Sequence, residues 1–229
     1  MKRITGLLAL GAVLAAPSMA LAEPQSGFYV APRLIYGSTH MRDVGMPYYD
    51  STGVLLDVIA IGNKRDNTFG GSIAVGYDLS KMNAPVRAEL EYAVFTEAKA
   101  EIVATDTIRQ SNRIQTLFMN AYYDIDTGTK FTPYVGAGIG MGFVRAKGLY
   151  EWMSSHPTSS KTKTNFAWNL GLGMGYKIAD NLALDIGYRF VDLGKAKSGL
   201  GDFGGGASHN TETNRIYQHQ FMVGTRVKF

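Results

Sequence analysis

The feature that most constrains this chain is a strict alternation of apolar and polar residues within eight separate segments. A period of two places alternate side chains on opposite faces, which is the pattern of a β-strand with one apolar and one polar side. A helix is disfavoured in the sixth segment, where glycines at every second position would each cost about 1 kcal/mol in a helix interior. The eight segments comprise residues 28–36, 69–78, 86–95, 115–125, 134–143, 166–177, 182–191 and 217–229.

The connections between these segments alternate between short and long. Those after the second, fourth and sixth segments are a few residues long and carry turn-forming sequences such as Asp126-Thr127-Gly128. The other four connections are polar loops, expected at about residues 40–67, 97–112, 146–163 and 194–214. An even number of strands with this alternation is what a chain needs to cross a membrane repeatedly and keep both ends on one side.

Three features indicate that the apolar face meets lipid and does not line a soluble ligand-binding barrel. The opposite face carries glycine, alanine and a few large charged residues, the mixture of sizes that fills a narrow eight-stranded interior. Strands of about ten residues tilted near 45° span roughly 25 Å, the height of an apolar membrane band. Aromatic residues gather in girdles at both strand ends, and the girdle at the short-turn end is expected to comprise Phe28, Tyr77, Tyr123, Tyr134, Tyr176 and Phe229. The sequence therefore predicts an all-β fold, an eight-stranded antiparallel transmembrane up-and-down β-barrel.

The first 22 residues have the pattern of a secretory signal peptide. Lys2 and Arg3 form its charged end, residues 7–16 form an apolar run, and Ala20-Leu21-Ala22 is a cleavage site of the A-x-A type. We expect residues 23–229 to form one barrel domain. Removing the two basic residues lowers the formal net charge from +4 to +2, which offers no electrostatic case for nucleic acid. The absence of cysteine excludes disulfides, thiolate catalysis and a lipid-anchored cysteine.

Three stretches carry a resemblance to a known family. They are PYVGAGIGMGF at residues 133–143, LDIGYRFVDLG at residues 184–194, and the alternating last segment that ends at Phe229. In these stretches the chain resembles the opacity-type branch of the OmpA-like eight-stranded outer-membrane proteins, which includes surface antigens of Gram-negative bacteria. The resemblance implies a Gram-negative outer membrane, with both chain ends and the short turns in the periplasm and the long loops outside the cell. It also implies that the barrel-assembly machinery reads the outward residues of the last strand, Phe221, Val223, Val227 and Phe229.

The inward face of the predicted barrel carries charges of both signs that nearly cancel. Six are basic, Arg33, Arg87, Lys177, Arg189, Arg226 and Lys228, and five are acidic, Asp78, Glu89, Glu91, Asp124 and Asp185. Unpaired charges in a narrow lumen are strongly unfavourable, so we expect an interior network of salt bridges and water. Such a network would fill the barrel. The alternative is a narrow or gated pore along the same groups.

No catalytic, cofactor or metal site is predicted. Some eight-stranded barrels modify lipid A with a histidine, a serine and an acid near the outer rim. The histidines of this chain are His40, His156, His209 and His219. The first three fall in predicted loops, and the last points to the lipid near the rim, so the geometry that a general base needs is missing. The glycine run at residues 136–140 lacks the helix that follows a nucleotide-binding loop. We therefore expect no enzymatic activity.

Two local features give further expectations. Pro32 lies within the first segment, where a closed barrel uses the N–H group that proline lacks, and it predicts a bulge or a distorted strand. The apolar run from Gly53 to Gly62 lies in the first long loop. It predicts either a hairpin that extends the neighbouring strands or an exposed apolar patch that binds host ligands or neighbouring proteins.

We interpret the chain as an outer-membrane surface protein whose barrel anchors four exposed loops. The loops would serve envelope integrity and contact with host molecules, in an adhesin or antigen role. A small channel for ions or hydrophobic solutes is the alternative function. The expected partners are outer-membrane lipid and lipopolysaccharide, the barrel-assembly machinery, and host-cell or extracellular ligands at the loops. Nucleic acid is not expected as a partner.

Overall fold

The computed structural model describes residues 27–103, 107–152, 154–157, 160–204 and 207–229, so the predicted signal peptide lies outside the described residues. Within these ranges no helix is long and apolar enough to cross a membrane, and η2 (Leu79–Met82) is a short 3₁₀ helix. The strands are β1 (Phe28–Tyr49), β2 (Leu55–Asp78), β3 (Val86–Phe95), β4 (Ala98–Val103), β5 (Thr107–Asp124), β6 (Phe131–Trp152), β7 (Ser154–Pro157), β8 (Lys161–Ala179), β9 (Leu182–Lys197), β10 (Gly201–Gly204), β11 (Ala207–His209) and β12 (Glu212–Lys228).

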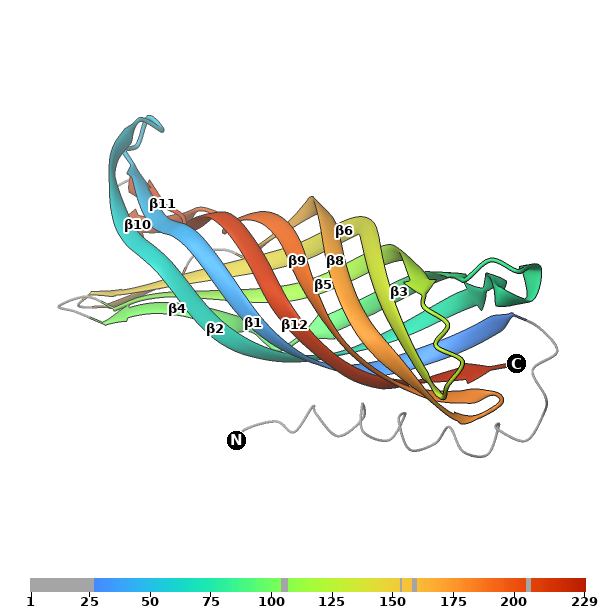
Figure 1. Cartoon of the computed structure of the whole chain (residues 1–229). Helices are drawn as coiled ribbons and strands as arrows, with labels where there is room; N and C mark the ends of the chain where they lie inside the picture. The colour runs from blue at the N-terminus through green and yellow to red at the C-terminus, as the bar shows by residue number, and fades with distance from the viewer. Residues whose placement is uncertain (1–26, 104–106, 153, 158–159, 205–206) are drawn as a thin grey trace.

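Eight long strands form a closed antiparallel ring (Figure 1). The order around the ring is β1, β12, β9, β8, β6, β5, β3 and β2, and the pairing of β2 with β1 closes it. The strands nearest the two chain ends, β1 and β12, pair along most of their length, as expected for an up-and-down barrel. The predicted fold, an eight-stranded antiparallel barrel, is confirmed.

The short turns close one end of this barrel, which we call the periplasmic end. η2 joins β2 to β3, residues 125–130 join β5 to β6, and residues 180–181 join β8 to β9. In the first turn the Asp78 carboxylate caps η2 by accepting a hydrogen bond from the Ser80 N–H at 2.9 Å. In the second turn the Asp126 carboxylate accepts one from Gly128, whose φ of +66° suits a residue without a Cβ. Tight turns of this kind hold the register in which lumen residues meet.

At the opposite end, which we call the outer end, the strands extend far beyond the predicted segments. Only residues 50–54 separate β1 from β2, where the sequence predicted a loop over residues 40–67. Short strands also pair there, β4 with β5, β7 with β6 and β11 with β1. The predicted loop bounds are therefore wrong, because hairpins occupy most of these residues. Beyond the bilayer a strand needs no apolar outer face, so the alternation that marks it in the sequence is lost.

Pro32 does not produce the predicted bulge. β1 keeps a single register against β12 from Val30 to Arg33, although no pair forms at Ala31 or Pro32. On its other side Pro32 pairs with Ile73, and no register shift occurs there. Around Pro32 the ladder with β12 therefore lapses for two residues, and the strand is not displaced.

Aromatic pairs mark both edges of the membrane band. At the periplasmic end the rings of Phe28 and Tyr77 meet edge to face, with their centroids 4.8 Å apart. At the outer end the centroids of Tyr36 and Phe69 lie 5.3 Å apart. Tyr134 was predicted to belong to the periplasmic girdle, and this placement is wrong, because Tyr134 is buried inside the barrel.

Candidate functional site

Two glutamates of β3, Glu89 and Glu91, form the centre of an ion-pair network inside the barrel. Arg33 of β1 donates to both carboxylates, from Nη2 to Glu89 Oε1 at 2.6 Å and from Nη1 to Glu91 Oε2 at 2.9 Å. Arg189 of β9 reaches Glu91 from the facing wall at 2.6 Å, and the Tyr29 hydroxyl donates to Glu89 at 2.9 Å. All five side chains are buried. Because they come from strands far apart around the ring, the network ties opposite walls together.

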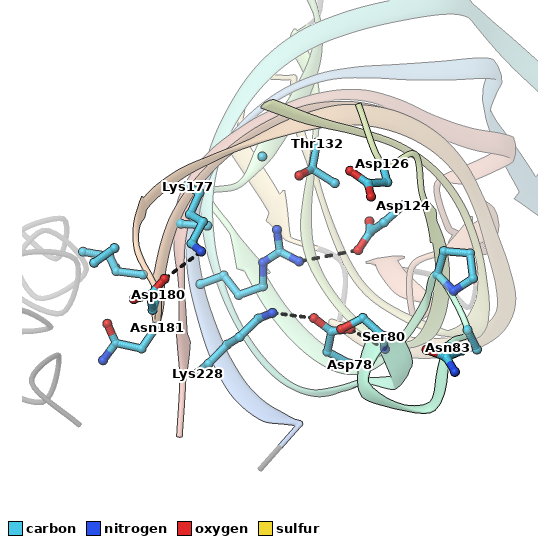
Figure 2. A pocket seen from close by; sticks show the side chains of 17 residues that line it. Asp78, Ser80, Asn83, Asp124, Asp126, Thr132, Lys177, Asp180, Asn181 and Lys228 are labelled. Atoms are coloured by element: carbon cyan, nitrogen blue, oxygen red, sulfur yellow. Dashed lines mark hydrogen bonds and ion pairs between the residues drawn. The ribbon is translucent and has the colours of Figure 1, made fainter. Parts of the chain in front are cut away.

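Three further ion pairs lie between this centre and the periplasmic end. They are Arg87 with Asp124, Arg226 with Asp185 and Lys228 with Asp78, with N–O distances of 2.6, 3.2 and 2.6 Å. Four of these side chains line a vestibule of about 400 Å³ at the periplasmic mouth, those of Asp78, Asp124, Arg226 and Lys228. Figure 2 shows Lys228 and Asp78 pointing toward each other within this vestibule. The charges of the vestibule therefore largely neutralise one another.

Lys177 was predicted to join the lumen network, and it lines the periplasmic vestibule. Its side chain is 57% exposed, and its Nζ lies 2.7 Å from Asp180 in the β8–β9 turn (Figure 2). The hydrogen bond from Lys177, together with its charge, holds the pKa of Asp180 below the usual value. Lys177 lies close to the end of β8 at Ala179, so its ion partner is a residue of the turn and not one of the predicted lumen acids. The other predicted lumen charges all take part in the ion pairs described above.

Buried tyrosines fill the lumen beside the ion pairs, and glycines on neighbouring strands make room for them. The rings of Tyr122 and Tyr134 flank the Arg87 guanidinium, whose carbon lies 4.8 and 5.0 Å from their centroids. A Cβ added at Gly173 would overlap the Tyr134 ring. Tyr134 was missed because strand-end aromatics were assigned to the girdles. The alternation could have placed Tyr134 correctly, because it lies two residues before the inward Gly136 and therefore on the same face of the strand.

Amides, hydroxyls and then apolar side chains occupy the lumen toward the outer end. Arg189 Nε donates to Gln220 at 2.6 Å, Gln220 donates to Gln218 at 2.7 Å, and Gln218 donates to the Thr39 hydroxyl at 2.8 Å. A buried apolar plug begins beside this layer, where the Arg189 guanidinium carbon lies 5.6 Å from the centroid of the Phe118 ring, and continues beyond it. The plug comprises Ile35, Met41, Val44, Met46, Ile61, Ala93, Phe95, Ala98, Ile114, Phe118, Val144, Ala146, Ala167, Val191, Leu193, Ala196 and Ile216. The plug was not predicted, because several of its residues, such as Met46, lay in segments interpreted as loops.

The histidines lie differently from the prediction. His40 belongs to β1 and not to a loop, and its ring stacks on Tyr217 of β12 with centroids 4.9 Å apart. His219 of β12 lies 5.3 Å from His40 and meets it edge to face. His156 and His209 lie in the short strands β7 and β11. Among the described residues, no group of three His, Cys, Asp or Glu could hold a metal ion.

The hairpin at the outer end of β1 and β2, residues 45–60, is called the arm. Figure 1 shows it curving away from the barrel. The curve follows β-bulges, with register shifts of β1 against β2 between Met41 and Gly45 and positive φ values at Asp43 and Gly62. Of the two alternatives for residues 53–62, the structure contains the hairpin extension.

The arm exposes apolar side chains toward its tip. Val54, Leu55, Leu56 and Val58 are 58%, 52%, 65% and 48% exposed, whereas Ile59 and Ile61, nearer the barrel, pack with the lumen plug. β2 pairs with β3 only along Gly70–Asp78, so within the described ladders the arm part of β2 pairs with β1 alone. The arm therefore combines exposed apolar side chains with an open strand edge.

The predicted closing residues lie at the end of β12. Phe221, Val223 and Phe229 are exposed on the lipid side, whereas Val227 is buried between its neighbours. Val227 pairs with Val30 on β1 and with Leu182 on β9. The outward residues of this strand are thus available to other molecules at three of the four predicted positions.

Comparisons with known proteins agree with this architecture. A family model described as "Outer membrane protein beta-barrel domain" matches residues 6–229, and the chain belongs to this family. The outer membrane protein PagN of Salmonella typhimurium is 30% identical over 181 residues, which cover 73% of this chain and 75% of PagN. A Rickettsia typhi protein named "Putative adhesin RT0816" is 30% identical over 186 residues, which cover 80% of this chain and 72% of that protein.

Among solved structures, Neisserial surface protein A is similar in fold. The superposition has a TM-score of 0.52 at 20% identity and covers 89% of this chain and 98% of that protein. The family and the fold together place this protein in the outer membrane of a Gram-negative bacterium, and the predicted localisation is confirmed.

Proposed function

We propose that this protein presents its outer hairpins for contact with host molecules or other extracellular ligands, with the barrel as their anchor. The arm is the observation that carries this proposal. A strand with apolar side chains on both faces is typical of a strand that other protein segments bury on both sides. In the arm the plug covers only Ile59 and Ile61, while Val54, Leu55, Leu56 and Val58 remain exposed. Exposed apolar patches of this kind mark interaction sites.

The filled lumen supports a role as scaffold. Buried ion pairs, an amide layer and the plug join all sides of the ring, so the hairpins stand on a body with little internal freedom. Recognition residues are usually carried on connections that a rigid scaffold positions. A stable barrel would also contribute to envelope integrity, the second part of the predicted role.

The relatives point in the same direction. The Rickettsia typhi protein carries the word adhesin in its name, and this chain covers most of its length. We infer an adhesin-type role without enzymatic activity for this chain as well, with a ligand that has an apolar surface complementary to the arm.

The alternative function, a small channel for ions or hydrophobic solutes, has less support. Paired charges occupy the periplasmic part of the lumen, and the plug, together with amides and hydroxyls that bond one another, fills the outer part. A conducting path needs continuous polar or wetted space, which these two layers oppose.

A double substitution on the arm tests the proposal. Leu56→Ser/Val58→Ser removes exposed apolar surface without changing the charge, so adherence of expressing bacteria to host cells should fall by about tenfold. Met82→Ser is the matched control, because Met82 is also exposed and lies in η2, at the periplasmic end of the barrel and away from the arm. Heat-modifiable migration on gels would verify that each barrel is folded. Unchanged adherence of the arm variant, and of a variant without residues 46–59, would contradict an adhesive role.

A further inference from the structure

Two arginines lie directly opposite each other on the outer surface of the barrel. Arg42 of β1 pairs in register with Arg215 of β12. Like charges in directly opposed positions destabilise a sheet unless another group balances them. Arg215 has such a group, because its Nη2 lies 2.6 Å from Asp192. Arg42 instead meets Tyr217, with Nε 3.4 Å from the hydroxyl and its guanidinium carbon 5.5 Å from the ring centroid.

A third arginine lies beside this pair. Arg65 of β2 is opposite His40 in the β1–β2 ladder, and its Nε donates to the Ser38 hydroxyl at 2.8 Å. The Ser38 hydroxyl also lies 3.4 Å from His40 Nε2. Within the described part of the chain, neither Arg42 nor Arg65 forms an ion pair.

Imidazole groups add further hydrogen-bonding capacity between the arginines. His40 lies on the Tyr217 ring and contacts His219 edge to face, and His219 Nδ1 shares a hydrogen bond with the Tyr188 hydroxyl at 2.7 Å. We call Arg42, Arg65, Arg215, His40 and His219 the basic cluster. Together with the Asp192 carboxylate, the cluster has a formal net charge of +2 when both histidines are neutral.

The basic cluster lies just beyond the outer aromatic girdle. Tyr36, which pairs with Phe69 and Phe221, marks the girdle on β1. His40 is four residues further along the strand, or about 13 Å at 3.3 Å per residue. With strands tilted near 45°, the cluster stands roughly 9 Å above the girdle. This is the depth of lipid headgroups and not of acyl chains.

We propose that the basic cluster binds a phosphate group of an outer-leaflet lipid, the phosphorylated glycolipid of lipopolysaccharide. Planar guanidinium groups suit phosphate oxygens, and Arg42 and Arg65 have unused donors for such an anion. An anion there relieves the repulsion between Arg42 and Arg215. The lipid source follows from the depth of the cluster, because its outward side chains face the leaflet. The proposal rests on the membrane location and not on the adhesive role.

A second pair of opposed arginines shows why this cluster stands out. Arg113 of β5 lies opposite Arg145 of β6. Arg113 is balanced by Glu97 at 3.2 Å, and Arg145 donates to the Ser160 hydroxyl at 2.9 Å without an aromatic or imidazole neighbour in the described contacts. That pair therefore has less unbalanced charge and fewer additional donors.

Binding of purified, folded protein to lipopolysaccharide in micelles tests the proposal. Wild-type protein should bind phosphorylated lipopolysaccharide about tenfold more tightly than the same material after enzymatic dephosphorylation. Arg42→Gln/Arg65→Gln should abolish this preference. Lys130→Gln/Lys177→Gln removes the same charge at the periplasmic end and should keep it. Heat-modifiable migration on gels confirms that each variant is folded.

Three outcomes would overturn the proposal. Equal binding of the phosphorylated and dephosphorylated lipopolysaccharide by the wild type would show that the protein does not recognise the phosphate group. A preference retained by the Arg42→Gln/Arg65→Gln variant would place the phosphate elsewhere. Inorganic phosphate that competes as effectively as the lipid would show a site for free anions and contradict the assignment to a lipid headgroup.

Discussion

Glu91 joins two walls of the barrel through a single carboxylate. One oxygen accepts from Arg33 and the other from Arg189, and all three side chains are buried. Removing one partner of a buried ion pair leaves an uncompensated charge in a medium of low dielectric constant, which costs more than the pair itself contributes. Removing a shared carboxylate such as that of Glu91 should therefore destabilise the barrel more than the loss of one ion pair alone would suggest.

We predict that Glu91→Gln destabilises the barrel by about 3 kcal/mol or more, because two guanidinium groups lose their counter-charge. Urea unfolding in detergent micelles measures the change. Glu97→Gln is the matched control, because Glu97 and its partner Arg113 are both partly exposed. An exposed pair contributes about 0–1 kcal/mol. Equal effects of the two substitutions would argue against a network that holds the walls together.

At the scale of the strand, the membrane-embedded part of each element could be predicted and the outer part could not. Between the girdles one face meets lipid and the other meets the lumen, and this contrast imposes the period of two. Beyond the girdle β1 has water on one side and the plug on the other, so its outer face need not be apolar. Met41 and Met46 therefore lie in a stretch whose sequence shows no alternation of apolar and polar residues.

The partner of a residue deep in the lumen, such as Arg33, was also beyond the sequence. The alternation of inward and outward side chains predicted that Arg33 and Glu89 face the lumen. It could not predict their contact, because β1 and β3 are not neighbours in the ring. Their contact depends on the stagger of β2 between them, which no residue of either strand encodes alone. The ion partner of Lys177 was missed for a related reason, because the alternation of side chains does not say where the strand ends and brings a turn residue such as Asp180 within reach.

The last strand, β12, allows a prediction at this scale. Phe229 is exposed on the lipid side, and its N–H donates to the Phe28 carbonyl oxygen at 3.0 Å. If the assembly machinery reads this end of β12, deletion of Phe229 should lower the amount of folded barrel in the outer membrane several-fold, since recognition precedes closure. Heat-modifiable migration of outer-membrane fractions measures it. Phe28→Ala, which removes a neighbouring girdle ring, should leave assembly close to wild type. Equal yields from both variants would contradict a terminal signal.

At the scale of the whole molecule, the lumen is a series of layers. From the periplasmic end it contains the vestibule, the ion pairs, the amide layer and the apolar plug. The vestibule admits water, but an ion that enters it next meets paired charges and then the amide layer and the plug, where buried polar groups such as Gln110 and Asn112 already bond protein partners. Moving an ion into such a region carries a large desolvation cost.

The layered lumen predicts that the folded protein in planar bilayers gives no steady unitary conductance. The physical reason is the plug, which comprises large side chains such as Phe118 and Leu193 from several walls and leaves an ion without solvation. Single-channel recording on heat-modifiable, folded protein measures this, with a known porin reconstituted in parallel to verify the bilayer. Reproducible unitary steps that depend linearly on voltage would contradict a closed lumen and favour the channel function over the scaffold.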